Sequence, residues 1–222
     1  MKETFLPNHK DIKLIQDEGM IGINTDTMLL GEFLNIYKED IVLDVGTNTC
    51  ALLLYASMFH PKKLIGLDIN VCALEYAKKN MDINNITNYE LVEGDILTYK
   101  GEEVDVIICN PPYFKTKEDN KSNKESLNIA KHEGDLTLEN LIPALRRNLK
   151  NNGTLFFLYQ TSRMQEVISE LTSNKFRIKE MQFAYDENKK QSSVFMIKAV
   201  KGGKMGVVVK KPYLITRNKD LF

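Results

Sequence analysis

From residue 41 onward the chain alternates short apolar runs with longer stretches of helical spacing. Ile41–Val45 and Val104–Cys109 are such runs, and their nearly continuous apolar side chains are typical of strands buried on both faces. Between runs lie segments such as Val71–Met81, whose apolar residues share one face of a helix. Strands joined through helices need crossover connections, which are right-handed and build a parallel sheet. The alternation therefore predicts an α/β fold with a mostly parallel sheet.

The two ends of the chain have a different rhythm. Runs at 176–185 and 193–200 are separated only by a short polar loop, which predicts an antiparallel hairpin that closes the sheet. Near the N-terminus, Ile12–Ile15 and Met20–Asn24 bracket Asp17-Glu-Gly19, which predicts a β-hairpin with its turn there. Thr25 or Asp26 can then cap a helix that runs to about Tyr37. Residues 63–68, 89–92 and 154–159 are the other expected strands, and 136–149 and 162–171 the other expected helices.

These elements predict three parts in a chain of 222 residues. Residues 1–38 would be an N-terminal hairpin and helix covering the active site, 39–200 the α/β domain, and 201–222 a basic C-terminal extension. A content of 43% hydrophobic and 27% charged residues excludes wholesale disorder. There is no apolar run of the ~20 residues that a membrane span needs, and no signal-peptide core at the N-terminus. Three cysteines without paired spacing indicate reduced thiols, so a cytoplasmic location is expected.

A net charge of zero hides a basic end. Nine basic residues and one acid lie between Lys189 and Asp220, so that segment carries +8 and the rest of the chain −8. Such a segment suits a polyanionic partner, and a solvated lysine-rich face explains it equally well. The loop 115–131 adds five lysines against three acids, with the same two interpretations. We expect a structural or substrate-orienting role for His132, because no other histidine has metal-ligand spacing with it.

Two features suggest an adenosine-containing cofactor. Leu43-Asp-Val-Gly-Thr-Asn-Thr-Cys50 forms the turn between the first strand and the first helix of the predicted sheet, where such folds bind nucleotides. Gly46 lets the backbone approach a ligand, although one glycine also suits an ordinary turn. Asp68 ends the second strand, 22 residues after Gly46, where a carboxylate can accept hydrogen bonds from a ribose diol. The alternative role for Asp68 or Asn70 is to cap the next helix.

The most specific feature is Asn110-Pro-Pro-Tyr113, directly after the fourth strand. The prolines end the strand and fix the carbonyl groups of the turn. The Asn110 side-chain oxygen and the Pro111 carbonyl can then both accept hydrogen bonds from one –NH₂ group. Tyr113 offers an aromatic face on which a planar substrate can stack. This pattern predicts chemistry on an amino or amide nitrogen.

Asn110-Pro-Pro-Tyr113 resembles the catalytic motif of class I S-adenosylmethionine-dependent methyltransferases that act on exocyclic or amide nitrogens. Asp44–Cys50 resembles their first motif, Asp68 their acidic second motif, and Glu93-Gly-Asp95 their third. Residues 23–31 and 129–139 resemble segments of the bacterial tRNA (adenine-N6) methyltransferases that modify the adenine beside the anticodon of a valine tRNA. The similarity extends from about Ile12 to Val200, most of the chain.

The resemblance implies a Rossmann-like, mostly parallel seven-stranded sheet, S-adenosylmethionine as cofactor and tRNA as partner, without a membrane or a metal and with a monomer favoured. The catalytic residues it implies are Asn110, Pro111, Pro112 and Tyr113. The cofactor-binding residues it implies are Asp44, Gly46, Asn48, Asp68, Ile69, Asp95, Ile96 and Asn110, with Asp95 near the adenine of the cofactor.

The sequence departs from the family at two positions of the first motif. The family usually has glycine where this chain has Asn48 and Cys50. Asparagine tolerates a positive φ better than other side chains, so Asn48 can keep the backbone of the turn. Cys50 adds a side chain where a close approach is expected, so a weakened cofactor affinity stays open, and with it a non-catalytic RNA-binding module. A protein N5-glutamine methyltransferase and a ribosomal-RNA guanine-N2 methyltransferase stay open as enzymatic alternatives.

Overall fold

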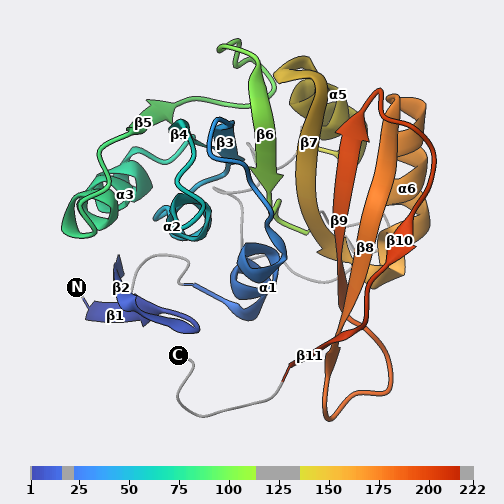
Figure 1. Cartoon of the computed structure of the whole chain (residues 1–222), viewed down its shortest axis with the longest axis horizontal. Helices are drawn as coiled ribbons and strands as arrows, with labels where there is room; N and C mark the ends of the chain where they lie inside the picture. Colours follow the sequence, from blue (N-terminus) through green and yellow to red (C-terminus); the bar gives the residue numbers. More distant parts are fainter. Residues whose placement is uncertain (1, 17–22, 114–135, 216–222) are drawn as a thin grey trace, which may run out of the picture.

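The computed structural model describes residues 2–16, 23–113 and 136–215, and its centre is one twisted sheet (Figure 1). Five strands pair in parallel in the order β5-β4-β3-β6-β7. They are β3 (Ile41–Val45), β4 (Lys63–Asp68), β5 (Tyr89–Glu93), β6 (Val104–Cys109) and β7 (Leu149–Gln160). The expected α/β class with a mostly parallel sheet is confirmed.

The C-terminal strands extend the sheet beyond β7. β9 (Val194–Lys201) lies between β7 and β8 (Phe176–Asp186) and is antiparallel to both, so the expected closing hairpin is confirmed. Two short strands, β10 (Val208–Val209) and β11 (Tyr213–Ile215), then pair in parallel with β8. The sheet therefore contains the seven expected strands and two further short strands at one edge, formed by residues 208–209 and 213–215.

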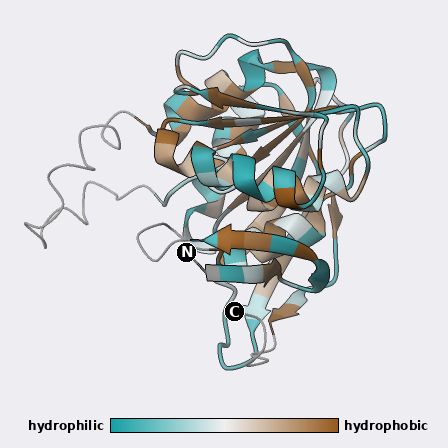
Figure 2. Cartoon of the chain, turned by 90° about the vertical axis from the view of Figure 1, so that its left-hand side faces the viewer, coloured by the Kyte–Doolittle hydropathy of each residue, from teal (hydrophilic) through white to brown (hydrophobic). Residues whose placement is uncertain are grey.

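Helices cover both faces of the sheet (Figure 1). One face packs against α1 (Thr25–Phe33), α2 (Ala51–Ser57) and α3 (Val71–Ile83). The other face packs against α5 (Leu138–Arg147) and α6 (Met164–Ser173), which follows the short 3₁₀ helix η2 (Thr161–Arg163). Because successive strand residues alternate in direction, Phe156 faces the α1 side and Phe157 the α5 side, and both are fully buried. In Figure 2 the mainly hydrophobic strands lie enclosed between the helical layers.

The N-terminal hairpin differs from the expected one. β2 (His9–Gln16) pairs with β1 (Lys2–Leu6) through a turn at Pro7 and Asn8, so the predicted pairing of 12–15 with 20–24 is wrong. Residues 17–22, which include the predicted turn, lie outside the described residues. A proline followed by an asparagine with φ of 64° makes the tighter turn, and β1 supplies the partner strand.

Asn80 of α3 and Asn84, which directly follows this helix, hold the free edge of β2. Asn80 accepts a hydrogen bond from the backbone N–H of Ile15 (2.6 Å) and donates to its carbonyl (3.1 Å). Asn84 repeats this pattern one turn later with Lys13, at 2.9 and 2.7 Å. Asn80 is fully buried and also donates to the carbonyl of Thr49 (2.9 Å). These side chains therefore substitute for a neighbouring strand, and they tie the hairpin to the turn after β3.

Helix α1 lies between this hairpin and the sheet. Asn24 caps it by accepting from the N–H of Thr27 (2.9 Å), so neither Thr25 nor Asp26 is the cap, and the helix ends at Phe33 rather than near Tyr37. The backbone of Gly31 in α1 packs closely against the ring of Tyr55, because a Cβ atom at Gly31 would lie 2.3 Å from that ring. This close packing fixes α1 against α2.

Candidate active site

The sheet register brings the predicted site residues to one edge. Val45 of β3 lies opposite both Leu67 of β4 and Cys109 of β6. The turn that begins at Gly46, the end of β4 at Asp68 and the Asn110 segment therefore emerge side by side. Carboxyl ends of parallel strands are where open α/β sheets bind ligands. The structure thus gathers segments that are separated by more than 60 residues of sequence.

The turn after β3 has a left-handed backbone at three positions. Gly46, Asn48 and Cys50 have φ of 74°, 48° and 69°. The prediction that Asn48 keeps the turn's backbone is confirmed. A Cβ added to Gly46 would meet no atom within 4 Å, so this point of the turn faces open space. The Cys50 side chain is buried in the core on the α2 side, where its sulfur accepts from the Thr47 hydroxyl at 3.7 Å. Cys50 therefore points away from the open side of the turn.

Asp68 braces the same turn. Its carboxylate accepts from the backbone N–H of Asn48 (2.7 Å) and from that of Asn70 (2.9 Å). The helix cap of α3 is Asn70, which accepts from the N–H of Ala73 at 3.2 Å. Each carboxylate oxygen has a second lone pair, so both can still accept from a diol. Next to it, Ile69 is 58% exposed and presents apolar surface at this edge.

Asp44 is a fully buried carboxyl group one residue before the end of β3. Neither of its oxygens has a well-placed hydrogen-bond partner among the described residues, although the Thr47 hydroxyl lies close enough to act on its charge. Burial raises the pKa of Asp44 to about 7; the nearby charge of Asp68 adds to the increase, and the Thr47 hydroxyl opposes it. Burying a polar group without a hydrogen-bond partner raises the free energy of the folded state. Asp44 is therefore a candidate for contact with a ligand.

Asp95 and Ile96 follow β5 at the same edge. Asp95 is half-buried, and one carboxylate oxygen accepts from the N–H of Leu97 at 2.9 Å. Ile96 is buried, and Arg147 of α5 donates to its carbonyl at 2.9 Å. The second oxygen of Asp95 takes no part in this hydrogen bond and can accept from an amino group.

Asn110-Pro-Pro-Tyr113 leaves β6 at the centre of this edge. Asn110 is half-buried, Pro111 is buried, and Pro112 and Tyr113 are exposed. The Tyr113 ring meets the ring of Tyr159 edge to face, with centroids 5.8 Å apart. Its hydroxyl donates to the carboxylate of Asp26, at the start of α1. Burial, together with this hydrogen bond, raises the pKa of Tyr113 above its usual range.

Sequence reasoning missed the Asp26 contact. The sequence indicates only a helix-capping role for Asp26, whereas the structure gives that role to Asn24 and leaves the Asp26 carboxylate to Tyr113. The available signal was its position within residues 23–31, a segment singled out for its family resemblance. Two other predictions, on the loop 115–131 and on His132, lie outside the described residues, as do residues 216–222 of the expected basic extension.

The residues at this edge fit an adenosine-containing cofactor. Open space at Gly46 allows a close approach, Asp68 and Asp95 keep acceptor positions, and Ile69 offers an apolar surface for a ring. In the part of the chain that the structure describes, no group of three or more His, Cys, Asp or Glu residues is arranged to hold a metal. No helix there is long and apolar enough to cross a membrane.

Three lysines of the basic C-terminal segment are engaged in the fold. Lys210 and Lys198 both pair with Glu180, at 2.9 and 3.4 Å. Lys201 is buried and donates to the carbonyl of Leu149. These three lysines stabilise the sheet, which leaves less of the +8 charge for a partner than the sequence suggested.

Comparison with known proteins places the chain among methyl-transferring enzymes. The family described as "Methyltransferase domain" matches residues 36–205. A tRNA1(Val) (adenine(37)-N6)-methyltransferase of Vibrio campbellii is 29% identical over 163 residues, covering 72% of this chain and 67% of the relative. A putative protein N5-glutamine methyltransferase of Methanocaldococcus jannaschii is 32% identical over 157 residues, covering 69% and 79%.

Solved structures share the fold. A predicted O-methyltransferase from Agrobacterium tumefaciens superposes with a TM-score of 0.63 at 14% identity, covering 86% of this chain and 87% of the other. A ribosomal protein L11 methylase from Lactobacillus delbrueckii subsp. bulgaricus gives 0.60 at 20% identity, covering 84% of each chain. At these identities the likeness concerns the fold alone.

Proposed function

Because the chain belongs to the methyltransferase-domain family and uses S-adenosylmethionine, we propose that it methylates the exocyclic N6 of an adenine in the anticodon loop of a tRNA. The class I fold expected from the sequence is confirmed. The name of the Vibrio campbellii relative supports tRNA as the substrate and, more narrowly, valine tRNA. Free thiols at Cys50, Cys72 and Cys109 and a tRNA substrate support a cytoplasmic location.

The observation that carries the proposal is the position of Asn110 and Pro111 beside the turn at Gly46. The N6 lone pair of adenine is delocalised into the ring, which makes the amine a poor nucleophile. Acceptors at the Asn110 side chain and the Pro111 carbonyl hold both N–H groups and favour the pyramidal, partly positive nitrogen of the transition state. The cofactor supplies an electrophilic methyl group on its sulfonium. The proton leaves to solvent, so no general base is required.

Tyr113 positions the adenine. Stacking on its ring fixes the approach of the base, so much of the rate gain comes from orientation. Asp26 holds the Tyr113 hydroxyl, and Tyr159 supports the ring from its edge. An adenine in an anticodon loop needs only to splay out of a single strand, which costs less than opening a duplex.

The cofactor would be held by the residues around the turn after β3. Gly46 and Asn48 form the backbone surface, Asp68 accepts from the ribose diol, and Asp95 accepts from the adenine amino group. The buried Asp44 is a candidate for contact with the bound cofactor, and Ile69 offers an apolar surface to the adenine. Ile96 lies buried next to Asp95, where the hydrogen bond from Arg147 to its carbonyl holds the backbone. Since the Cys50 side chain points into the core, the departure at this position leaves the binding surface intact and speaks against a decayed, non-catalytic module.

A protein N5-glutamine methyltransferase is the second candidate. A glutamine side chain presents the same –NH₂ group to Asn110 and Pro111, and the Methanocaldococcus jannaschii relative carries that name. A ribosomal-RNA guanine-N2 enzyme would use the same acceptors. The substrate, rather than the chemistry, separates these alternatives.

The experiment uses labelled S-adenosylmethionine with two substrate pools, unmodified tRNA and translation-factor protein. We expect label in N6-methyladenosine from tRNA. Asn110→Ala should lower kcat by about 10²–10³-fold, the usual cost of losing one transition-state hydrogen bond. The control, Asn151→Ala, changes an exposed asparagine near the start of β7 and should leave kcat unchanged. Label in glutamine, or a folded Asn110→Ala variant that keeps most of its activity, would refute the proposal.

A further inference from the structure

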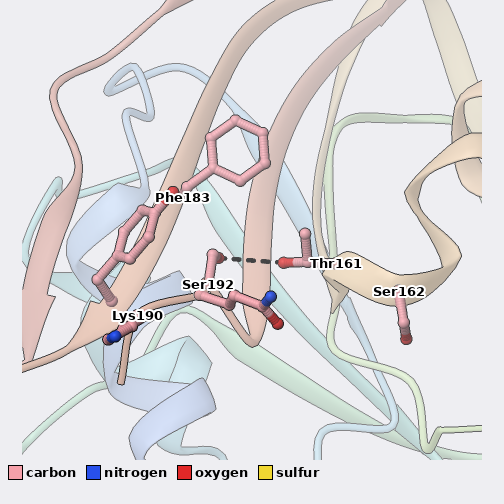
Figure 3. Close-up of a pocket in the computed structure, with 7 residues that line it drawn as sticks. Thr161, Ser162, Phe183, Lys190 and Ser192 are labelled. Carbon is pink, nitrogen blue, oxygen red and sulfur yellow. Dashed lines mark hydrogen bonds between the residues drawn. The ribbon is translucent and has the colours of Figure 1, made fainter. Parts of the chain in front are cut away.

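A surface hollow lies beside the proposed active site, where the end of β7 meets β8 and the loop between β8 and β9 (Figure 3). Its volume is about 400 Å³, within the range of pockets that bind small ligands. Two half-buried aromatic residues, Phe183 and Tyr185, form one part of the lining. The rest is formed by Thr161, Ser162, Gln191, Ser192 and the exposed Lys190. The hollow thus combines aromatic surface, neutral hydrogen-bonding groups and one cation.

The wall of the hollow is held in place by hydrogen bonds. The hydroxyl groups of Thr161 and Ser192 lie 3.1 Å apart, as the dashed line in Figure 3 marks. The N–H of Thr161 donates to the carbonyl of Ser193 at 3.0 Å, and the Ser192 hydroxyl donates to the carbonyl of Val194 at 2.8 Å. Because these bonds join the β8–β9 loop to η2, the hollow is formed before any ligand binds, which lowers the entropic cost of binding.

A row of aromatic residues connects the hollow with the proposed catalytic segment. Tyr159 of β7 lies opposite Phe195 of β9, which lies opposite Phe183 of β8. Three adjacent strands span roughly 10 Å, so Phe183 lies about that far from Tyr159. Tyr159 in turn contacts Tyr113 at 5.8 Å between centroids. The hollow therefore lies on the same edge of the sheet as Tyr113, at a distance that a single-stranded segment of a few nucleotides can span.

We propose that this hollow binds the base of a nucleotide that flanks the target adenine in the same RNA strand. The base stacks on the aromatic surface of Tyr185, Gln191 and Ser192 offer hydrogen bonds to its edge, and Lys190 contacts the adjoining phosphate. The inference rests on the proposed function, because it requires RNA as the substrate. It adds a second point of contact, which fixes the direction of the strand across the active site.

The charges around the hollow favour a base over a phosphate cluster. The loop that carries Lys190 also carries the exposed Glu187 and the half-buried Asp186, which accepts from the N–H of Asn188 at 2.9 Å. These two carboxylates lie close to Lys190 and would repel several phosphate groups bound near one another. Aromatic and neutral polar groups around a single cation suit one nucleotide, in which the base supplies most of the contact area.

The test compares methylation of an anticodon stem-loop RNA by the wild type and by Tyr185→Ala. Loss of one stacked base should raise KM for the RNA about tenfold, with kcat and cofactor affinity unchanged. Tyr185→Phe keeps the ring and should restore most of the affinity. Lys190→Ala should raise KM several-fold and reduce the salt dependence of binding by about one phosphate contact. The matched control is Lys62→Ala, an exposed lysine at the amino-terminal end of β4, which should leave KM unchanged.

A second RNA series locates the bound base. Each RNA of this series lacks one base at a position on one side of the target adenine. One of these RNAs should have a higher KM than the intact stem-loop with the wild type. The same RNA should cause no further increase in KM with Tyr185→Ala, because both changes remove the same contact. If Tyr185→Ala misfolds, Lys190→Ala on the exposed loop carries the test with the same RNAs. RNA methylation that is unaffected by either variant overturns this inference alone. Absence of RNA methylation by the wild type overturns the proposed function and this inference with it.

Discussion

The buried carboxyl group of Asp44 should make the protein less stable as the pH rises. Its pKa is raised by burial from 3.8 to about 7, so the folded state holds this proton more tightly than the unfolded chain does. The stability that the proton provides is complete below pH 3.8 and is lost as the pH rises towards 7. Asp44→Asn keeps the shape of the side chain without a titrating group and should remove this dependence.

The size of the effect follows from the two pKa values. Each unit of pKa difference corresponds to about 1.4 kcal/mol, and linkage between pH 5 and pH 8 gives a loss of about 2.5 kcal/mol in the free energy of unfolding. Because Asp44 is fully buried, solvent screening reduces this figure little. The asparagine variant should therefore gain about 2.5 kcal/mol relative to the wild type over this pH range.

The measurement is urea denaturation of the cofactor-free protein at pH 5, 6, 7 and 8. Asp11→Asn, which changes an exposed carboxylate of β2, is the matched control, and its curve should run parallel to that of the wild type. A constant difference between Asp44→Asn and the wild type at all four pH values would refute the reasoning, because it would mean that Asp44 stays ionised in the folded protein.

Three further predictions concern packing and backbone strain. Cys50→Gly should be more stable than Cys50→Ala by about 0.5–1 kcal/mol in chemical denaturation, because both lose the sulfur but only glycine relieves the left-handed backbone; equal stabilities would contradict this. Gly31→Ala should lower stability by about 2 kcal/mol in thermal unfolding, since its Cβ would lie 2.3 Å from the Tyr55 ring, and a wild-type melting temperature would show that the ring moves freely. Asn80→Ala leaves the backbone groups of Ile15 unpaired and should lower the stability of the hairpin by about 2–4 kcal/mol. Hydrogen exchange should show this as lost protection in β1 and β2, with protection of the central strands unaffected.

The central sheet was predictable because each of its strands carries its own signal. Val104–Cys109 is apolar except at Asp105 and is followed by Asn110 and two prolines, and the structure has the same bounds for β6. β7 begins earlier than expected, at Leu149 instead of Thr154, because polar residues and a register shift hide its first part. The predicted pairing of the N-terminal hairpin is wrong because Asp17-Glu-Gly19 is a stronger turn signal in the sequence than Pro7-Asn8.

The candidate site was predictable where the residues belong to one turn. Asn48 was expected to adopt a positive φ, and it does. The contact between Asp26 and Tyr113 joins residues 87 positions apart, and no local pattern encodes it. The hollow near Lys190 likewise depends on how three strands and a loop are aligned. Such features arise from tertiary packing, which periodicity and spacing do not describe.

The way that α3 holds the hairpin also bears on the order of folding. β2 depends on side chains of Asn80 and Asn84, which lie 65 to 71 residues further along the chain. These acceptors reach their positions only when α3 has formed against the sheet, so the hairpin joins after the central strands and opens before them. Because Asn80 also donates to the Thr49 carbonyl, the helix that holds the hairpin also holds the turn after β3. The hairpin, which precedes the central strands in the chain, would then dock after them.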